Sequence, residues 1–81
     1  MFMRHSHHWA MQLRYRSNIT DELLEYAILN APVLRDVRLP DARSASCRIP
    51  GSGRTLKVVY LLKDAVTIVT AYWMDHDGTM V

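Results

Sequence analysis

The 81-residue sequence has few of the residues that mark secreted, fibrous or membrane proteins. Its single cysteine, Cys47, cannot form an internal disulfide, which points to a cytoplasmic protein rather than a disulfide-stabilised secreted domain. With only three glycines and three prolines and no low-complexity stretch, the chain is not expected to be intrinsically disordered as a whole. The longest apolar runs, at 58–62 and 66–74, are too short and too interrupted to span a bilayer. The sequence therefore predicts a soluble protein with no membrane partner.

Motifs for nucleotides, metals and covalent catalysis are also missing. The chain contains neither a phosphate-binding loop nor a GxGxxG fingerprint. His5, His7 and His8 are close in sequence and His76 is far away, but their spacing fits no zinc-ligand pattern. Cys47 has no partner base at the spacing of a known nucleophile. We therefore expect no metal and no cofactor.

The composition is that of one small folded domain, with 49% hydrophobic and 22% charged residues. We assign the domain to residues 1–75 and a flexible tail to 76–81. The net charge is only +2, yet eight of the ten basic residues are arginine. The planar guanidinium group of arginine suits phosphate, which hints at an anionic partner. The frequency of arginine in proteins also rises with genomic GC content, so the arginine bias alone does not decide the function.

The first half of the chain has helical periodicity. A short edge strand is predicted at 2–5 and a helix at 7–16. A second helix begins near Thr20, a good N-cap residue, and ends before Pro32 because the residue preceding a proline avoids the helical region. The buried face of this helix is expected to contain Leu23, Leu24, Ala27 and Ile28.

The second half has the alternation and the β-branched residues of strands. Strands are predicted at 33–39, 43–49, 55–62 and 66–74, with a turn at 50–53. The predicted fold class is α+β, with two N-terminal helices packed on a three- to four-stranded antiparallel meander sheet.

A two-residue loop at Lys63 and Asp64 would place Lys57 opposite Thr70 and Thr55 opposite Tyr72, all on one face of the sheet. The other face would be apolar and suited to the helices, with Leu56, Val58, Tyr60, Leu62, Thr67, Val69, Ala71 and Trp73. The mixed face suits a ligand. The alternative is that Lys57 is a solvated lysine and Thr70 an ordinary strand residue.

One further pattern contains residues that could act in catalysis. His8, Gln12 and Arg16 form a stripe along the first helix, at i, i+4 and i+8. Metal-free RNA cleavage needs a proton acceptor and donor, which a histidine can supply, and cations that stabilise the phosphate. Hydroxyl groups such as those of Thr70 and Tyr72 can orient the phosphate, and a tyrosine ring can stack on an unpaired base. We take these residues as a candidate RNA site.

Two segments carry a resemblance to a known family. Residues 6–19 read SHHWAMQLRYRSNI and resemble the SxHAxxRMxxRGI opening of small uncharacterised domains associated with phages and toxins. Residues 53–60, GRTLKVVY, and 66–72, VTIVTAY, resemble the GRxLxVVY and IxTxY strands of the same domains. These domains are similar to the barnase–EndoU–colicin–RelE-like nuclease superfamily. The resemblance implies two helices on an antiparallel sheet and an RNase-type toxin that needs no metal.

The resemblance also implies roles for individual residues. The catalytic set would be His8, Arg16, Lys57, Thr70 and Tyr72, with substrate binding by Arg54, Gln12 and Arg14. Gln12 occupies the position of the family's first arginine, and Arg14, two positions on, belongs to a different helix face. The implied partners are RNA and a cognate antitoxin or immunity protein.

A second hypothesis from a different class is a non-catalytic interaction protein on the same fold, such as a phage-encoded inhibitor, an antitoxin-like partner or an RNA-binding regulator. Gln12 at an arginine position and the small net charge favour it. An exposed edge strand at 2–5 or 43–49 would also allow a homodimer.

Overall fold

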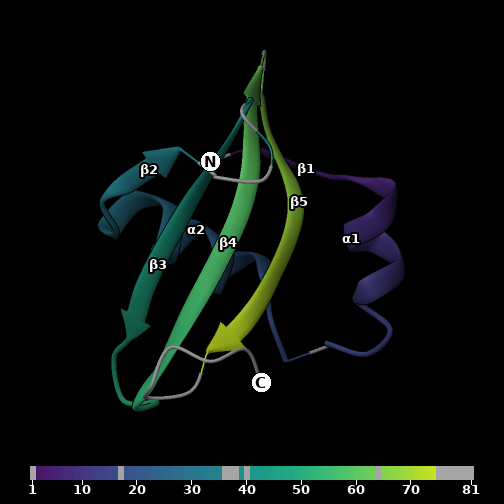
Figure 1. Cartoon of the computed structure of the whole chain (residues 1–81). Coiled ribbons are helices and arrows are strands. Elements are labelled where there is room, and N and C mark those ends of the chain that lie inside the picture. The colour runs from purple at the N-terminus through teal and green to yellow at the C-terminus, as the bar shows by residue number, and fades with distance from the viewer. Residues whose placement is uncertain (1, 17, 36–38, 40, 64, 75–81) are drawn as a thin grey trace.

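The computed structural model of the chain describes residues 2–16, 18–35, 39, 41–63 and 65–74 (Figure 1). In chain order, its elements are β1 (Met3–His5), α1 (His7–Gln12), α2 (Asp21–Asn30), β2 (Val33–Arg35), β3 (Ala42–Ile49), β4 (Arg54–Lys63) and β5 (Ala65–Met74). The α+β class with two N-terminal helices is confirmed. The predicted tail at 76–81 lies outside the described residues.

The sheet is larger than predicted and is mixed rather than antiparallel. Its five strands follow the order β1-β5-β4-β3-β2, and only the pairing of β1 with β5 is parallel. The predicted edge strand at 2–5 is therefore present as β1. Parallel pairing needs a long connection, and both helices lie in the chain between β1 and β5. At the other edge, β2 covers the first three residues of the predicted strand at 33–39, and residues 36–38 lie outside the described part.

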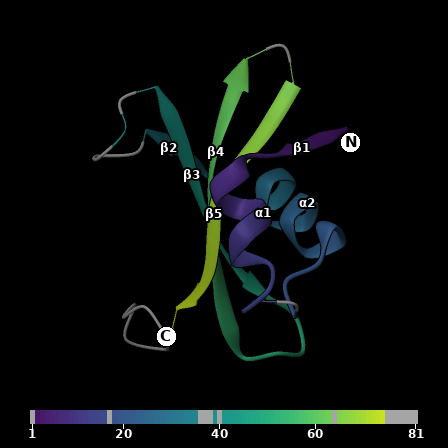
Figure 2. The ribbon, with the colours of Figure 1, turned by 90° about the vertical axis from the view of Figure 1, so that its right-hand side faces the viewer.

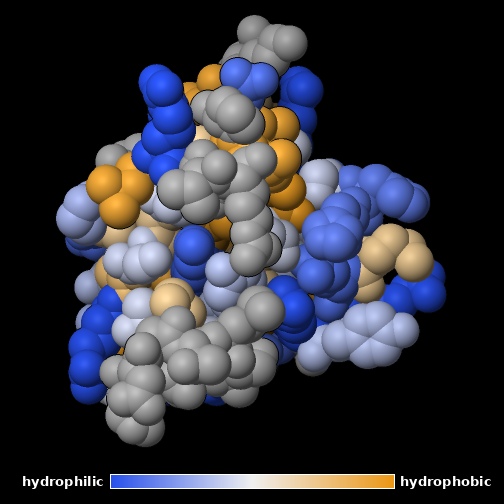
Figure 3. Space-filling model, in the orientation of Figure 1, coloured by the Kyte–Doolittle hydropathy of each residue, from blue (hydrophilic) through white to orange (hydrophobic). Residues whose placement is uncertain are grey.

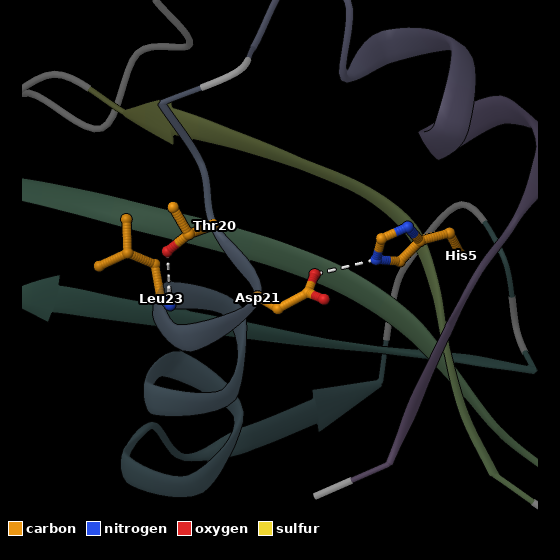
Figure 4. Close-up of polar contacts among 4 residues, drawn as sticks. All are labelled: His5, Thr20, Asp21 and Leu23. Carbon is orange, nitrogen blue, oxygen red and sulfur yellow. Dashed lines mark hydrogen bonds and ion pairs between the residues drawn. The ribbon is translucent and has the colours of Figure 1, made fainter.

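Each helix begins at a side-chain cap. The Ser6 hydroxyl accepts a hydrogen bond from the Trp9 backbone N–H at 3.0 Å and begins α1. The Thr20 hydroxyl accepts one from the Leu23 N–H at 3.3 Å, so α2 begins as predicted (Figure 4). Beside this cap, Nε2 of His5 lies 2.9 Å from Oδ1 of Asp21 and links β1 to α2. Capping of this kind satisfies backbone N–H groups that lack a partner within the helix.

The regular part of the first helix is shorter than the predicted range of 7–16. Helix α1 ends at Gln12, and residues 13–15 continue as turns. The backbone N–H of Arg16 still donates to the Gln12 carbonyl at 3.1 Å, so the chain completes one more turn. The stripe formed by His8, Gln12 and Arg16 therefore keeps its helical spacing despite the early end of α1.

The core lies between the helices and one face of the sheet (Figure 2). Helix α1 contributes Trp9, which is fully buried, and α2 contributes Leu24, Ala27 and Ile28, with Leu23 partly buried. Leu56, Val58, Tyr60, Ile68 and Ala71 form the sheet side of the core. Helix α2 packs on β3 and β4, whereas α1 packs beside β5 and β1 (Figures 1 and 2). Neither of the two described helices covers the other face of the sheet, which we call the helix-free face (Figure 2).

The β4–β5 hairpin is in a different register from the predicted one. Lys57 lies opposite Tyr72 and Thr55 opposite Met74, so the pairings of Lys57 with Thr70 and of Thr55 with Tyr72 are wrong. The turn is tighter, since Lys63 pairs with Ala65, and a bulge follows it. A bulge inserts one unpaired residue and changes which side chains face each side of the strand.

The bulged residue is Val69. It lies between Thr70, which pairs with Val59, and Ile68, which pairs with Tyr60. Between the turn and the bulge, Ile68 and Val66 are buried in the core, in place of the predicted Thr67 and Val69. After the bulge, the predicted alternation of β5 holds.

The remaining strands agree with the sequence pattern. Strand β3 covers the predicted 43–49 segment, and the turn that follows it contains Gly51 and Gly53 at φ of 80° and 70°. Those backbone angles favour glycine over residues with a Cβ atom. In the described part of the chain, no helix has the length and apolar character needed to cross a membrane.

Candidate functional site

The helix-free face of the sheet carries three of the predicted site residues. Lys57 on β4 lies opposite Tyr72 on β5, and Val59 lies opposite Thr70. Side chains alternate along a strand, so Lys57, Thr70 and Tyr72 share the face turned away from Val58 and Ala71 of the core. The predicted common face is therefore present, although its register differs.

Segment 6–16 borders this face because it lies along the edge of β5 beyond the end of β1. Strand β1 pairs only with Val66–Ile68. Further along β5, the Ser6 hydroxyl donates to the Val69 carbonyl at 3.2 Å. Arg16 Nη1 donates to the Ala71 carbonyl at 2.7 Å. Two side chains thus satisfy carbonyl groups at an edge without a neighbouring strand.

Gln12 joins this border to the sheet. The Thr70 hydroxyl donates to Oε1 of Gln12 at 2.5 Å. Arg16 lies near the Tyr72 ring, with its guanidinium carbon 6.0 Å from the ring centroid. The structure therefore brings together five of the eight predicted site residues. We call Gln12, Arg16, Lys57, Thr70 and Tyr72 the Gln12–Tyr72 cluster.

His8 lies beside this cluster rather than within it. It is exposed on α1, one helical turn before Gln12 on the same stripe. Residues one turn apart on a helix have Cβ atoms about 5–6 Å apart. The His8 side chain forms no hydrogen bond with any residue that the structure describes, and the ring is exposed at the edge of the face.

Two predicted substrate-binding residues lie elsewhere. Arg54 is three positions from Lys57 on β4, an odd number, and alternation therefore places it on the opposite face. There its guanidinium carbon lies 4.7 Å from the centroid of the Trp73 ring, a cation–π contact. Arg14 is exposed and does not belong to the stripe of His8 and Gln12. The cluster contains neither arginine.

Sequence reasoning missed two cations on the helix-free face. Arg4 on β1 is in register with Thr67, and Arg48 on β3 lies opposite Thr55. Both Thr67 and Thr55 belong to that face, so both arginines do too. The parallel pairing of β1 with β5 brings Arg4 to this face, and the register of the β3–β4 hairpin brings Arg48 there.

Charge is unequally distributed over the described residues. None of the described strand residues on the helix-free face is acidic, whereas Asp21, Glu22 and Glu25 all lie on α2. Hydrophilic residues line the side of the helix-free face where α1 lies (Figure 3). An open recess lies away from this site, between β1 and α2, and is lined by Phe2, Met3, Asp21, Glu22 and Glu25.

The site has the chemistry of an anion-binding surface. It offers cations, hydroxyl groups, one amide and one aromatic ring on a rigid sheet. Within the described ranges, no group of three or more histidine, cysteine, aspartate or glutamate side chains is arranged to hold a metal ion. Comparison of the chain with protein-family models, with curated proteins and with solved structures found no match.

Proposed function

We propose that the protein is a metal-independent endoribonuclease that holds single-stranded RNA on the helix-free face of its sheet. The observation that carries the proposal is the Gln12–Tyr72 cluster, in which Lys57, two hydroxyl groups and an aromatic ring share one face and a second cation, Arg16, borders it. Such a surface can bind a phosphate backbone and a stacked base at the same time.

The binding roles follow from the position of each side chain. Lys57 and Arg16 flank the Tyr72 ring and are suited to the phosphate. The ring can stack on an unpaired base, a contact that single strands allow and duplexes hinder. Arg4 and Arg48 extend the positive charge along the sheet on both sides of Lys57. Charge of this kind attracts RNA whatever its sequence.

Cleavage would use the 2′-hydroxyl of the bound strand as the nucleophile. Its proton passes to a base, the 2′-oxygen bonds to phosphorus, and the bond from phosphorus to the 5′-oxygen breaks. The leaving 5′-oxygen takes up a proton, and the products are a 2′,3′-cyclic phosphate and a 5′-hydroxyl. His8 carries the imidazole of the stripe, and an imidazole can act as a general base or acid. Arg16 and Lys57 stabilise the charge that develops on phosphate.

A specific observation favours the second candidate function, a non-catalytic RNA-binding regulator. Gln12 and Arg16 are already bonded within the protein, to Thr70 and to the Ala71 carbonyl. His8 has no described side chain to orient it. A surface with these properties can bind RNA without cutting it.

The test is cleavage of a fluorescent single-stranded RNA in EDTA by wild type, His8→Ala and His7→Ala. His7 is the matched control, because it is also exposed on α1 but lies outside the stripe. We expect His8→Ala to lose at least about 100-fold in rate, the typical contribution of a general acid or base, and His7→Ala to keep its activity. A substrate with 2′-O-methyl groups should remain intact.

The outcomes separate the two functions. Loss of cleavage in His8→Ala alone, with RNA binding retained, supports the nuclease. Binding without cleavage by wild type would overturn the nuclease and support the regulator. No binding, or equal cleavage by all three proteins, would refute the proposed roles.

A further inference from the structure

We propose that Gln12 reads the base of the bound strand and selects bases with a keto oxygen, uracil and guanine, over those with an amino group, cytosine and adenine. The proposal rests on the proposed RNA binding and assigns a specificity to the same site. It follows from how the Gln12 amide is used within the protein.

The hydrogen bond from Thr70 to Gln12 fixes what the amide can still offer. A threonine hydroxyl has one proton to donate, and Thr70 gives it to Oε1 of Gln12 at 2.5 Å. The carbonyl end of the Gln12 amide is therefore held by the sheet. Its NH₂ group has two protons, and Gln12 donates neither of them to a described residue. The free end of the amide is thus a donor.

The position of Gln12 is suitable for contact with a stacked base. Thr70 and Tyr72 are two residues apart on one face of β5, which corresponds to about 6.6 Å along the strand. Gln12 is bonded to the first of these residues, and the ring of the second is the stacking surface. A base lying on the Tyr72 ring would therefore have its edge within reach of the Gln12 NH₂ group.

The segment that carries Gln12 is held in place. Ser6 and Arg16 bond to carbonyl groups of Val69 and Ala71, one on each side of Thr70 along β5. The amide is thus held between two anchors and can discriminate between bases without a large loss of side-chain freedom.

The chemistry of the base edges sets the preference. Uracil has an O4 acceptor where cytosine has an N4 amino donor, and guanine has an O6 acceptor where adenine has an N6 amino donor, while N7 is an acceptor in both purines. A donor on the protein forms a hydrogen bond with a keto oxygen, but it cannot form one with an amino group, which is itself a donor. Glutamine can also read adenine, but that mode presents Oε1 and the NH₂ group to the base together, and here Oε1 is directed toward Thr70.

The experiment measures binding of nine-residue 2′-O-methyl oligonucleotides of uridine or cytidine by fluorescence anisotropy. These ligands keep the base edges and cannot be cleaved through the 2′-oxygen. The two pyrimidines have rings of the same size, so the comparison isolates the edge. We expect wild type to bind the uridine oligonucleotide about 10-fold more tightly, toward the lower end of the range for base-edge contacts.

Two variants of Gln12 sharpen the test. Gln12→Leu has no polar group and should bind both oligonucleotides equally. Gln12→Glu keeps an acceptor for Thr70 but presents an oxygen in place of the NH₂ group, so the ratio should reverse in favour of cytidine. Its negative charge weakens both complexes, which is why the ratio is the readout. Circular dichroism and thermal melting establish that each variant is folded.

Each outcome bears on one of the two proposals. Equal binding of both oligonucleotides by wild type, or a ratio that Gln12→Leu does not change, overturns the role of Gln12 and leaves RNA binding intact. If wild type binds neither oligonucleotide, the proposed function fails and the base preference fails with it. A preference that disappears in Gln12→Leu and reverses in Gln12→Glu supports both.

Discussion

Replacement of Arg16 by methionine tests whether this arginine anchors segment 6–16 to the sheet. Methionine keeps much of the length of the side chain but removes the donor that reaches the Ala71 carbonyl at 2.7 Å. A hydrogen bond from a charged group contributes about 1.5–3 kcal/mol when buried. The contact is only partly buried, so we expect a loss of about 1–2 kcal/mol. The cation–π contact with Tyr72 adds little, because 6.0 Å is at the outer limit for such contacts.

The assay is thermal and chemical unfolding of Arg16→Met beside Arg14→Met. Both variants lose one positive charge, but Arg14 is exposed and its side chain forms no hydrogen bond with the described residues. For a domain of this size, 1–2 kcal/mol corresponds to a fall in Tm of roughly 5–15 °C, and Arg14→Met should change the free energy of unfolding by less than about 0.5 kcal/mol. Equal loss in both variants would refute the anchoring role, since net charge alone would then explain the result.

Three further predictions address other features. Burial raises the pKa of the Tyr60 phenol above 10.0, and Arg43 partly lowers it. The folded state therefore holds this proton more tightly than the unfolded state, and the stability it confers is lost as pH rises above 10. Tyr60→Phe should flatten this alkaline loss in urea titrations, whereas parallel curves for the two proteins would contradict the prediction. Thr20→Ala should lower the free energy of unfolding by about 1 kcal/mol through loss of the α2 cap, whereas Thr20→Ser should keep most of the wild-type stability. An unchanged urea midpoint in Thr20→Ala would exclude the cap as a source of stability. Lys57→Gln should weaken RNA binding and reduce the slope of log affinity against log salt by about 1; an unchanged slope would place the phosphate elsewhere.

Local features of the fold could be predicted from the sequence because they depend on neighbouring residues. Thr20 and Pro32 set the ends of α2, and the apolar spacing of Leu24, Ala27 and Ile28 gives its buried face. Strands β4 and β5 could likewise be predicted from their β-branched residues. The parallel pairing of β1 could not be predicted, since it depends on contacts between the two ends of the chain.

The site could be predicted only where side chains alternate regularly between the two faces along a strand. Lys57, Thr70 and Tyr72 lie on the same side of the bulge, so they share a face in the predicted register and in the observed one. Thr67 and Val69 changed sides because the extra residue at Val69 interrupts the period of two, and no residue type marks that position. The bond between Gln12 and Thr70 joins segments 58 residues apart, beyond the reach of any local pattern.

The position of β1 at the edge of the sheet has a consequence for biosynthesis. A chain is made from its N-terminus, and β1 is the first strand to be complete, but its backbone partner is β5, the last strand of the sheet. Met3 therefore cannot pair with Val66 until nearly the whole domain has been translated. The β3–β4 and β4–β5 hairpins are local and can form as they leave the ribosome. Strand β1 can pair only after β5 has been synthesised.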